Sequence, residues 1–229
     1  MMFNPNHAHL LFEQSGVFRD AFMRHGIPAT CYDIRNVYGQ TDELVNIFSE
    51  VYLALAGRHT ILDKITDRDI IFAFFPCTYF TYAGLPQYKG NELVAQTLIS
   101  SERMDKTAEY FKNLMNLIRL AIYRHWKLII ENPYPRTLLS MYMPFPPAVV
   151  DYDRTTRGDK FAKSTAYWFF GFEPSRQEPL PDYPSNLDRK KVNDFTTRQR
   201  SEITPEYAYN FIADFILNKP RPRTQLSLI

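Results

Sequence analysis

The feature that most constrains the fold is a run of six apolar residues, Ile70 to Phe75, which ends at Pro76-Cys77. A run that is apolar on both faces is typical of an inner strand of a parallel sheet, because helices cover both faces of such a sheet. A second apolar run, Trp126 to Ile130, ends at Glu131-Asn132-Pro133. Open α/β sheets bind ligands at the edge formed by the carboxyl ends of their strands. The sequence therefore predicts that Cys77 and Glu131 lie at one such edge.

Short apolar runs and longer amphipathic stretches alternate along the rest of the chain, which is typical of an α/β domain. This pattern predicts three further strands, the last of which ends the sheet, at residues 9–12, 29–33 and 165–172. It predicts helices at residues 17–25, 41–55, 101–123 and 205–217. Gly26 and Gly57 are natural helix stops, and Thr204 is a natural N-cap. The segments rich in Pro, Gly and polar residues are predicted to be loops, at 78–92, 144–159 and 173–193.

Length and composition are those of an ordinary globular protein. The 229 residues can bury one sizeable core, and 45% of them are apolar and 23% charged. The net charge of +2 gives no overall attraction to nucleic acid, and basic residues near the C-terminus are explained equally well by a solvated surface. No stretch approaches the roughly 20 apolar residues that cross a bilayer. We therefore expect a cytoplasmic monomer with no membrane partner.

The chain has two cysteines, Cys31 and Cys77. Two cysteines are too few for a disulfide scaffold, and neither has the spacing of a zinc ligand, so we expect a reducing compartment and no metal. Taken singly, Cys77 is explained as a buried thiol at a strand end, Gly16 as a glycine at a helix start, and Glu131 as a surface acid. Their occurrence together at one predicted edge is what indicates a catalytic site.

Three segments resemble motifs of the cytosine-C5 DNA methyltransferases, in the order of that family. Motif IV, in which an acid-led strand runs into Phe-Pro-Cys, is resembled by DIIFAFFPCTYFTYAG (Asp69 to Gly84). Motif VI is resembled by LIIENPYPRTLLS (Leu128 to Ser140), with Glu-Asn-Pro in place of Glu-Asn-Val. Motifs I and II are similar to LLFEQSGVFRDAF (Leu10 to Phe22), followed by CYDI. The resemblance covers most of residues 8–172.

The resemblance implies a fold, a cofactor and an activity. The fold is that of class I S-adenosylmethionine-dependent methyltransferases, a Rossmann-like α/β sheet with helices on both faces. The catalytic domain comprises residues 1–172 and 198–219, with a small residual target-recognition region at 173–197 and a flexible tail at 220–229. The implied cofactor is S-adenosyl-L-methionine. The implied partner is DNA, whose cytosine is flipped into the pocket and methylated at C5.

The resemblance also implies roles for single residues. Cytosine C5 is a poor nucleophile, so a thiolate, here Cys77, first adds to C6, and a carboxylic acid, here Glu131, stabilises the charge that develops near N3. The residues implied to bind the cofactor are Phe12, Gly16, Asp33 and Asp63. Those implied to bind the substrate are Pro76, Asn132 and Lys163. The Gln-x-Arg-x-Arg motif of the family is missing, and Lys163 is the candidate that replaces its cationic side chains, with Arg157 as a second candidate. For both residues the role could be contact with the base, contact with phosphate, or a structural one.

Departures from the family pattern leave alternatives open. Gln14 replaces the first glycine of motif I, so that Gly16 alone remains of the usual pair. Asp63 is explained equally well as a surface acid. Residues 173–197 are too few for a full target-recognition domain, which must place several side chains in the major groove. The alternatives are therefore C5 modification of cytosine in RNA or in a free pyrimidine nucleotide, and a catalytically silent protein that binds DNA or cofactor.

Overall fold

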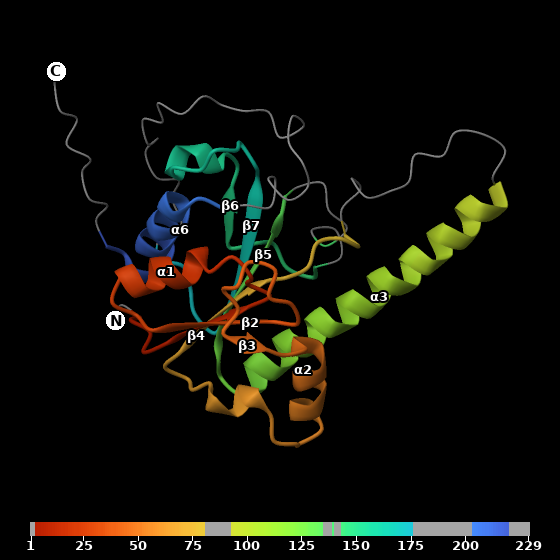
Figure 1. Cartoon of the computed structure of the whole chain (residues 1–229), viewed down its shortest axis with the longest axis horizontal. Helices are drawn as coiled ribbons and strands as arrows, with labels where there is room; N and C mark the ends of the chain where they lie inside the picture. Colours follow the sequence, from red (N-terminus) through yellow and green to blue (C-terminus); the bar gives the residue numbers. More distant parts are fainter. Residues whose placement is uncertain (1–2, 81–92, 135–138, 140–142, 176–202, 220–229) are drawn as a thin grey trace.

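The computed structural model describes residues 3–80, 93–134, 139, 143–175 and 203–219, and for residues 93–100 it describes the backbone alone. Its centre is a seven-stranded sheet with the order β3-β2-β1-β4-β5-β7-β6 (Figure 1). The strands are β1 (Ala8–Leu11), β2 (Ala29–Asp33), β3 (Glu43–Leu44), β4 (Ile70–Phe74), β5 (Lys127–Pro133), β6 (Val149–Asp151) and β7 (Thr165–Phe170).

The sheet is doubly wound and mixed. Strands β3, β2, β1, β4 and β5 are parallel, whereas β7 runs antiparallel to both β5 and β6. The chain proceeds from β1 outward to β3 and then returns to β4 on the other side of β1. The order therefore reverses between β1 and β4, and this is the position at which Rossmann-like sheets bind their ligands.

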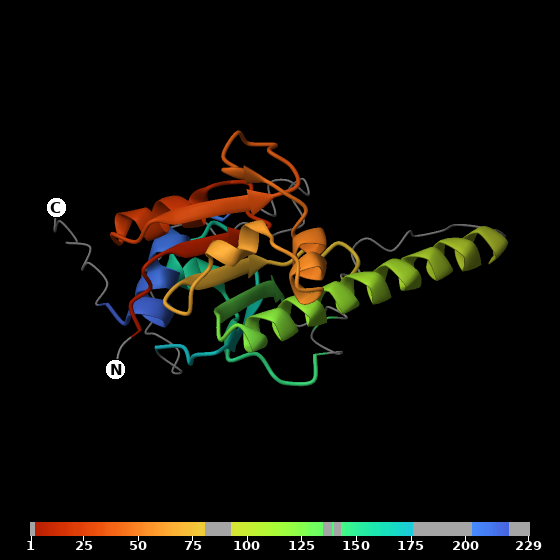
Figure 2. The same ribbon diagram turned by 90° about the horizontal axis from the view of Figure 1, so that it is seen from below.

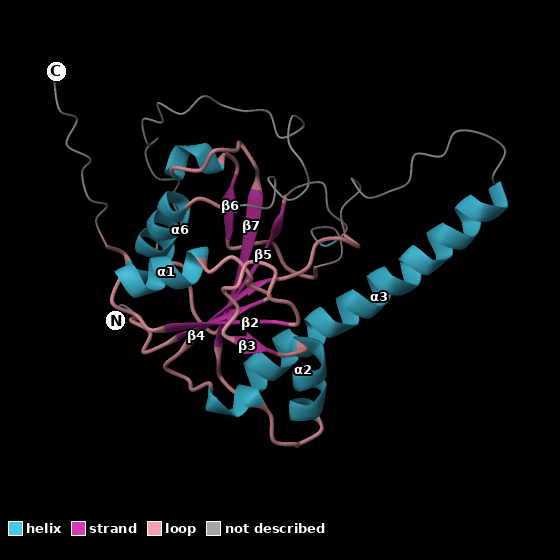
Figure 3. Ribbon diagram, in the orientation of Figure 1, coloured by secondary structure: helices cyan, strands magenta, loops and turns pink. Residues whose placement is uncertain are grey.

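Helices cover both faces of the sheet (Figures 2 and 3). The helical segments are α1 (Val17–Arg24), α2 (Ile47–Leu55), η1 (Ile61–Lys64), α3 (Leu93–Tyr123), η3 (Arg154–Arg157), α6 (Pro205–Phe211) and its π-helical continuation η5 (Ile212–Leu217). From β4, Ile71 and Ala73 pack with α2 and α3, whereas Ile70 and Phe72 pack with α1 and α6. The two-sided burial predicted for this strand is confirmed. The N-terminal half of α3 projects beyond the sheet (Figure 1).

Several local predictions are confirmed. Strand β2 has the predicted bounds, and α1 lies within one residue of its predicted end. Gly26 and Gly57, the predicted helix stops, both adopt left-handed backbone angles, with φ of +82° and +73°. The Thr204 side chain accepts a hydrogen bond from the Tyr207 backbone amide at 3.2 Å, as an N-cap does.

Two helix starts were wrongly predicted. The helix predicted at 41–55 begins only at Ile47, because the Asn46 side chain caps it by accepting from the amides of Phe48 and Ser49. The residues before it form the short strand β3. The helix predicted from residue 101 begins at Leu93. Capping chemistry and strand pairing set these boundaries more strongly than the apolar period does.

The far side of the sheet also differs from prediction. Strand β5 does not end at Ile130 but continues through Glu131 and Asn132 to Pro133, because β7 pairs with it over this length. The predicted loop 144–159 contains β6 and η3. Strand β7 was predicted to end the sheet, but β6 lies beyond it at the edge. Most of the predicted loops 78–92 and 173–193, and the predicted tail 220–229, lie outside the described residues.

A buried histidine, His9, lies at the start of β1 beside the half-buried His7, on the edge opposite the carboxyl ends of the strands. His9 is 3% exposed, its Nδ1 is 2.9 Å from the Tyr32 hydroxyl, and its Nε2 is 3.7 Å from an Asp69 carboxylate oxygen. Burial, and secondly the charge of His7, lowers the pKa of His9 to about 4, with a smaller contribution from Lys64 and an opposing one from Asp69. His9 is therefore neutral in the folded protein at pH 5.

We expect His9 to make the protein less stable in acid. The unfolded chain protonates this histidine near pH 6.5, whereas the folded chain does so only near pH 4, so the free energy of unfolding falls as pH falls between these values. The expected loss between pH 7 and pH 5 is about 2 kcal/mol, measured by urea unfolding. The variant His9→Gln is the comparison. An equal pH dependence in both proteins would contradict the assignment.

Candidate active site

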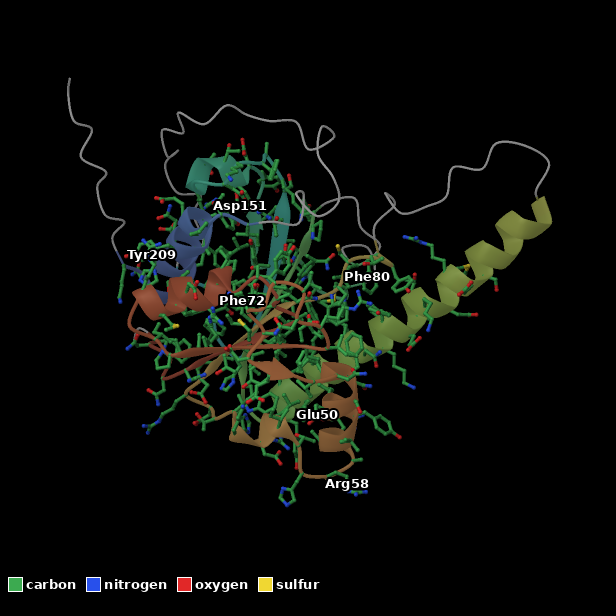
Figure 4. The ribbon with its side chains drawn as sticks, in the orientation of Figure 1. Glu50, Arg58, Phe72, Phe80, Asp151 and Tyr209 are labelled. Atoms are coloured by element: carbon green, nitrogen blue, oxygen red, sulfur yellow. The ribbon has the colours of Figure 1, made fainter. Side chains whose placement is uncertain are left out.

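The carboxyl ends of β1, β2, β4 and β5 bring most of the predicted site residues to one edge of the sheet. Asp33 ends β2, Glu131 lies near the end of β5, and Phe12 and Cys77 follow β1 and β4. Figure 4 marks Phe80 in the segment after β4, at this edge, and Arg58 at the opposite end of the molecule. The predicted convergence of Cys77 and Glu131 at one edge agrees with this arrangement.

Hydrogen bonds fasten the segment that carries Cys77 on two sides. On the sheet side, the Asn132 Nδ2 of β5 donates to the Phe75 carbonyl at 3.1 Å. On the helix side, Arg103 of α3 donates to the Thr78 carbonyl at 3.2 Å. Within the segment, the Phe80 amide donates to the Cys77 carbonyl at 2.9 Å and closes a turn. Pro76 and Cys77 are half-buried, so the thiol is held in place yet accessible.

Asn132 makes a structural contact beside the segment that carries Cys77. Its side chain is fully buried, and its amide nitrogen is used to hold the Phe75 carbonyl. Its Oδ1 accepts no hydrogen bond within the described part of the chain. An unsatisfied buried acceptor costs free energy. The Asn132 side chain lies at the junction of β4 and β5 in spite of this cost.

Cys77, Glu131 and Lys163 form a cluster in which the charges of Glu131 and Lys163 shift the pKa of the Cys77 thiol and of each other. Burial, and secondly the charge of Glu131, raises the pKa of the Cys77 thiol, while Lys163 opposes this rise. Burial raises the pKa of Glu131, while Lys163 and Arg154 oppose that rise. Burial lowers the pKa of Lys163, while Glu131 opposes the fall. The cluster therefore combines a thiol, a carboxyl group and an amine whose pKa values are shifted by burial and by neighbouring charge.

Element η3 carries two buried arginines. Arg154 is 1% exposed, pairs with Asp159, and places its guanidinium 4.8 Å from the centre of the Tyr207 ring. Arg157 pairs with Asp151 at 2.6 Å. Arg157 is thereby tied to β6, so of the two predicted cationic candidates it is Lys163 that lies beside Cys77 and Glu131.

The turn between β1 and α1 has strained backbone and is held by the carboxylate of Glu13. Phe12 adopts a left-handed φ of 61°, which is uncommon outside glycine, and its ring packs 5.3 Å from the Phe48 ring. Gly16 has a φ of 73°, and a Cβ there would lie 3.0 Å from Arg19. The carboxylate of Glu13 accepts hydrogen bonds from the amides of Ser15 at 2.8 Å and Gly16 at 2.9 Å, and from the Ser15 hydroxyl.

The sequence interpretation missed Glu13. The signal in the sequence is an acid followed by Ser and Gly at the second and third positions after it, a spacing at which a carboxylate can accept from the backbone amides of a tight turn. Asp33, by contrast, lies where it was predicted, 5% exposed at the end of β2, where one carboxylate oxygen accepts from the Arg35 amide at 2.8 Å.

Asp63 does not join the other predicted cofactor residues. It caps η1, which precedes β4, and it pairs with Arg124 at 2.7 Å. The Thr60 amide and secondly Arg124 lower the pKa of Asp63 to about 2. A pocket of about 490 Å³ opens beside it, lined also by Arg58, Arg119 and Arg124. Asp63 is held by the Thr60 amide and by Arg124, in the segment before β4, which agrees with the interpretation of Asp63 as a surface acid.

The cluster predicts how Cys77 reacts with iodoacetamide, which attacks the thiolate. Replacement of Glu131 by Gln removes the negative charge that raises the pKa of the thiol, so alkylation at pH 7.5 should become several-fold faster than in the wild type. Replacement of Lys163 by Gln should make it several-fold slower for the opposite reason. Mass spectrometry of the alkylated peptide gives both rates.

Cys31 is the internal control for this experiment. Its side chain is fully buried, and burial raises the pKa of its thiol far above the usual range, so it should stay unmodified in the folded protein. Equal alkylation rates in the Glu131→Gln and Lys163→Gln variants would show that the three groups do not interact.

Comparison of the chain with family models and with curated proteins gives no match. Within the described ranges, no helix combines the length and apolar character needed to span a bilayer, and no group of three or more His, Cys, Asp or Glu side chains could hold a metal ion. The functional interpretation therefore rests on the geometry and charge of the cluster around Cys77.

Proposed function

We propose that this protein is an S-adenosylmethionine-dependent methyltransferase that methylates C5 of cytosine in DNA through a covalent adduct with Cys77. The observation that carries the proposal is a half-buried thiol, fastened at the end of β4, which interacts electrostatically with Glu131 and Lys163. A nucleophile, an acid and a cation at the carboxyl edge of a doubly wound sheet are what this reaction requires.

The sheet supports the methyltransferase fold. The order reverses between β1 and β4, as in Rossmann-like domains, and β7 runs antiparallel between β5 and β6. A reversed strand at this end of the sheet also occurs in class I methyltransferases. Fold alone does not define an activity, so the residues of the site have to carry the rest.

The turn after β1 fits S-adenosylmethionine better than a dinucleotide. Dinucleotide enzymes bind a pyrophosphate with the amides that open the helix after β1. Here the carboxylate of Glu13 occupies the amides of Ser15 and Gly16. Asp33 ends β2, where Rossmann-like domains accept hydrogen bonds from ribose hydroxyls, and the half-buried Phe12 ring lies nearby. When bound, S-adenosylmethionine supplies a methyl group on a sulfonium.

Each residue of the cluster has a separate role in the proposed reaction. Cys77 loses its proton, and its sulfur forms a bond to C6 of the cytosine while the electron pair of the C5–C6 double bond shifts into the ring. Glu131, whose pKa is raised by burial, donates a hydrogen bond or its proton at N3, where negative charge accumulates. Lys163 stabilises the thiolate. Once C5 is methylated, loss of its proton restores the double bond and expels the sulfur of Cys77.

A DNA duplex with 5-fluorocytosine at the target position tests this mechanism. Fluorine cannot leave C5 as a proton does, so the bond between Cys77 and C6 should persist and give a covalent complex on a denaturing gel. The band should require S-adenosylmethionine and should be absent in Cys77→Ala. No covalent band with any cytosine substrate would refute the proposal.

Parallel methylation assays identify the substrate. Duplex DNA, single-stranded DNA, RNA and dCMP are compared with labelled S-adenosylmethionine. The short segment 173–197 is the reason for including the alternative substrates, because it offers few side chains for reading a duplex. Transfer to DNA is the expected result, and transfer confined to RNA or to dCMP would replace the DNA assignment by one of those alternatives.

A further inference from the structure

A pocket of about 490 Å³ lies far from the candidate active site, where the C-terminal ends of α2 and α3 meet η1. Figure 4 shows Arg58, which lines this pocket, at the end of the molecule opposite Phe80 in the segment after β4. Pockets that bind small ligands have volumes of about 300–1,000 Å³. The pocket is therefore large enough for a small molecule, and the proposed methyl transfer does not use it.

Two helix ends build the lining of this pocket. Helix α2 stops before Gly57, whose φ of +73° turns the chain so that Arg58 joins the lining. In α3, Arg119 and Tyr123 are four residues apart and therefore lie on one face of the helix. The apolar part of the lining comes from Ala54, Leu55 and Leu120. The pocket thus combines positive charge with apolar surface.

The charge of the lining is positive. It contains the arginines Arg58, Arg119 and Arg124 and one acid, Asp63. Arg124 is fixed from two sides, because its Nη1 donates to an Asp63 oxygen at 2.7 Å and its guanidinium lies 5.3 Å from the centre of the Trp126 ring. Asp63 therefore balances Arg124. Arg58 and Arg119 form no ion pair with another residue of the described ranges, so their charges are unbalanced.

Unbalanced arginines beside an exposed aromatic ring match the two parts of a nucleotide. A guanidinium group binds phosphate through two parallel hydrogen bonds. Tyr123 is 78% exposed, so a face of its ring is open to a flat base. An inorganic anion would leave the apolar surface uncovered, and an uncharged ligand would leave the guanidinium groups of Arg58 and Arg119 without a partner. A phosphate ester of a nucleoside satisfies both parts of the lining.

We propose that this pocket binds a nucleoside diphosphate, with the phosphates at Arg58 and Arg119 and the base against the ring of Tyr123. The two unbalanced cations correspond to the two phosphate groups of this ligand. The pocket lies at the end of the molecule opposite the candidate active site, so binding there is independent of the proposed methyl transfer.

Isothermal titration calorimetry of the full chain with GDP tests the proposal. Guanine occurs neither in the proposed cofactor nor in the proposed target base, so GDP has no expected site at the catalytic edge. Guanosine and inorganic pyrophosphate are the partial probes. GDP should bind about tenfold more tightly than either one, because each partial probe lacks one of the two sets of contacts. Failure of GDP to bind, or an equal affinity for GDP and a partial probe, would overturn the proposal.

Variants of the lining locate the two parts of the ligand. Arg119→Gln should weaken GDP binding about tenfold, because glutamine cannot form charged hydrogen bonds with phosphate, and Arg58→Gln should do the same from the other wall. Tyr123→Leu should weaken GDP binding about fivefold and leave pyrophosphate binding unchanged, since it removes only the stacking surface. GDP affinity at the wild-type level in both arginine variants would overturn the placement of the phosphates. An equal loss of GDP and pyrophosphate binding in Tyr123→Leu would overturn the placement of the base.

Arg68→Gln is the matched control. Arg68 is exposed, lies between η1 and β4, and is not among the residues that line the pocket, so this variant deletes the same charge from a neighbouring segment. Solvent screens the charge, so GDP affinity should change by less than about twofold. Circular dichroism melting of every variant shows whether the fold is kept. An equal loss of affinity in Arg68→Gln and Arg119→Gln would indicate general electrostatic attraction and would overturn the assignment of a site.

Discussion

Replacement of Cys77 by alanine should lower the rate of methyl transfer by a factor of about 10⁴ or more while S-adenosylmethionine still binds within about twofold of the wild-type affinity. The reason is that no other described side chain at this edge offers a thiol, since Cys31 is fully buried in β2. In the proposed mechanism the thiol acts on the base and not on the cofactor, so binding and catalysis should separate. Transfer of a labelled methyl group, with calorimetry for the cofactor, measures both.

Cys31→Ala is the control for this experiment. It removes the other thiol of the chain from the core of β2, where a small cavity should cost about 1 kcal/mol of stability and leave the transfer rate nearly unchanged. A Cys77→Ala protein with wild-type activity would exclude covalent catalysis by this residue, whatever the substrate.

The largest effect on stability is expected from Asp159→Ala. Asp159 is fully buried and pairs with Arg154, whose side chain is 1% exposed, through the Arg154 Nε at 2.5 Å and the Arg154 Nη2. The variant leaves a buried guanidinium without this carboxylate, which should lower the free energy of unfolding by about 3–5 kcal/mol. Urea unfolding at pH 7 measures the difference.

A double variant distinguishes the lost charge pair from general damage to η3. Arg154→Leu combined with Asp159→Ala removes both charges, and the pair of changes should be less destabilising than the sum of the single ones. Strict additivity would indicate that the two side chains do not compensate each other. Because Arg154 also opposes the rise in the pKa of Glu131, the single variant Arg154→Leu should make that acid harder to ionise.

Elements with a strong local pattern could be predicted from the sequence. The apolar run at Ile70 to Phe74 and the run that ends at Asp33 are buried strands because helices cover the sheet on both sides. Elements that depend on pairing with distant residues could not be predicted from the sequence. Strand β6 has three residues and follows two prolines, and it forms by pairing with β7. The end of β5 is polar and forms by pairing with β7 and, at Glu131, also with β4.

The same distinction applies to the candidate site. Cys77 and Glu131 follow apolar runs and were recognised by resemblance, and the structure brings both to one edge with Lys163. Glu13 was missed because its partners are the backbone amides of a turn, which leave little trace in the side-chain pattern. Asp63 was linked to the cofactor by its order in the chain, whereas its partner Arg124 is far away in sequence.

The contact between Asn132 and the Phe75 carbonyl has a mechanical consequence. It joins the residue after Glu131 to a residue two positions before Cys77, across neighbouring strands that are about 4.8 Å apart. This hydrogen bond couples the backbone that carries Glu131 to the backbone that leads into Cys77. A displacement of either strand end must therefore break the bond or move the neighbouring strand as well.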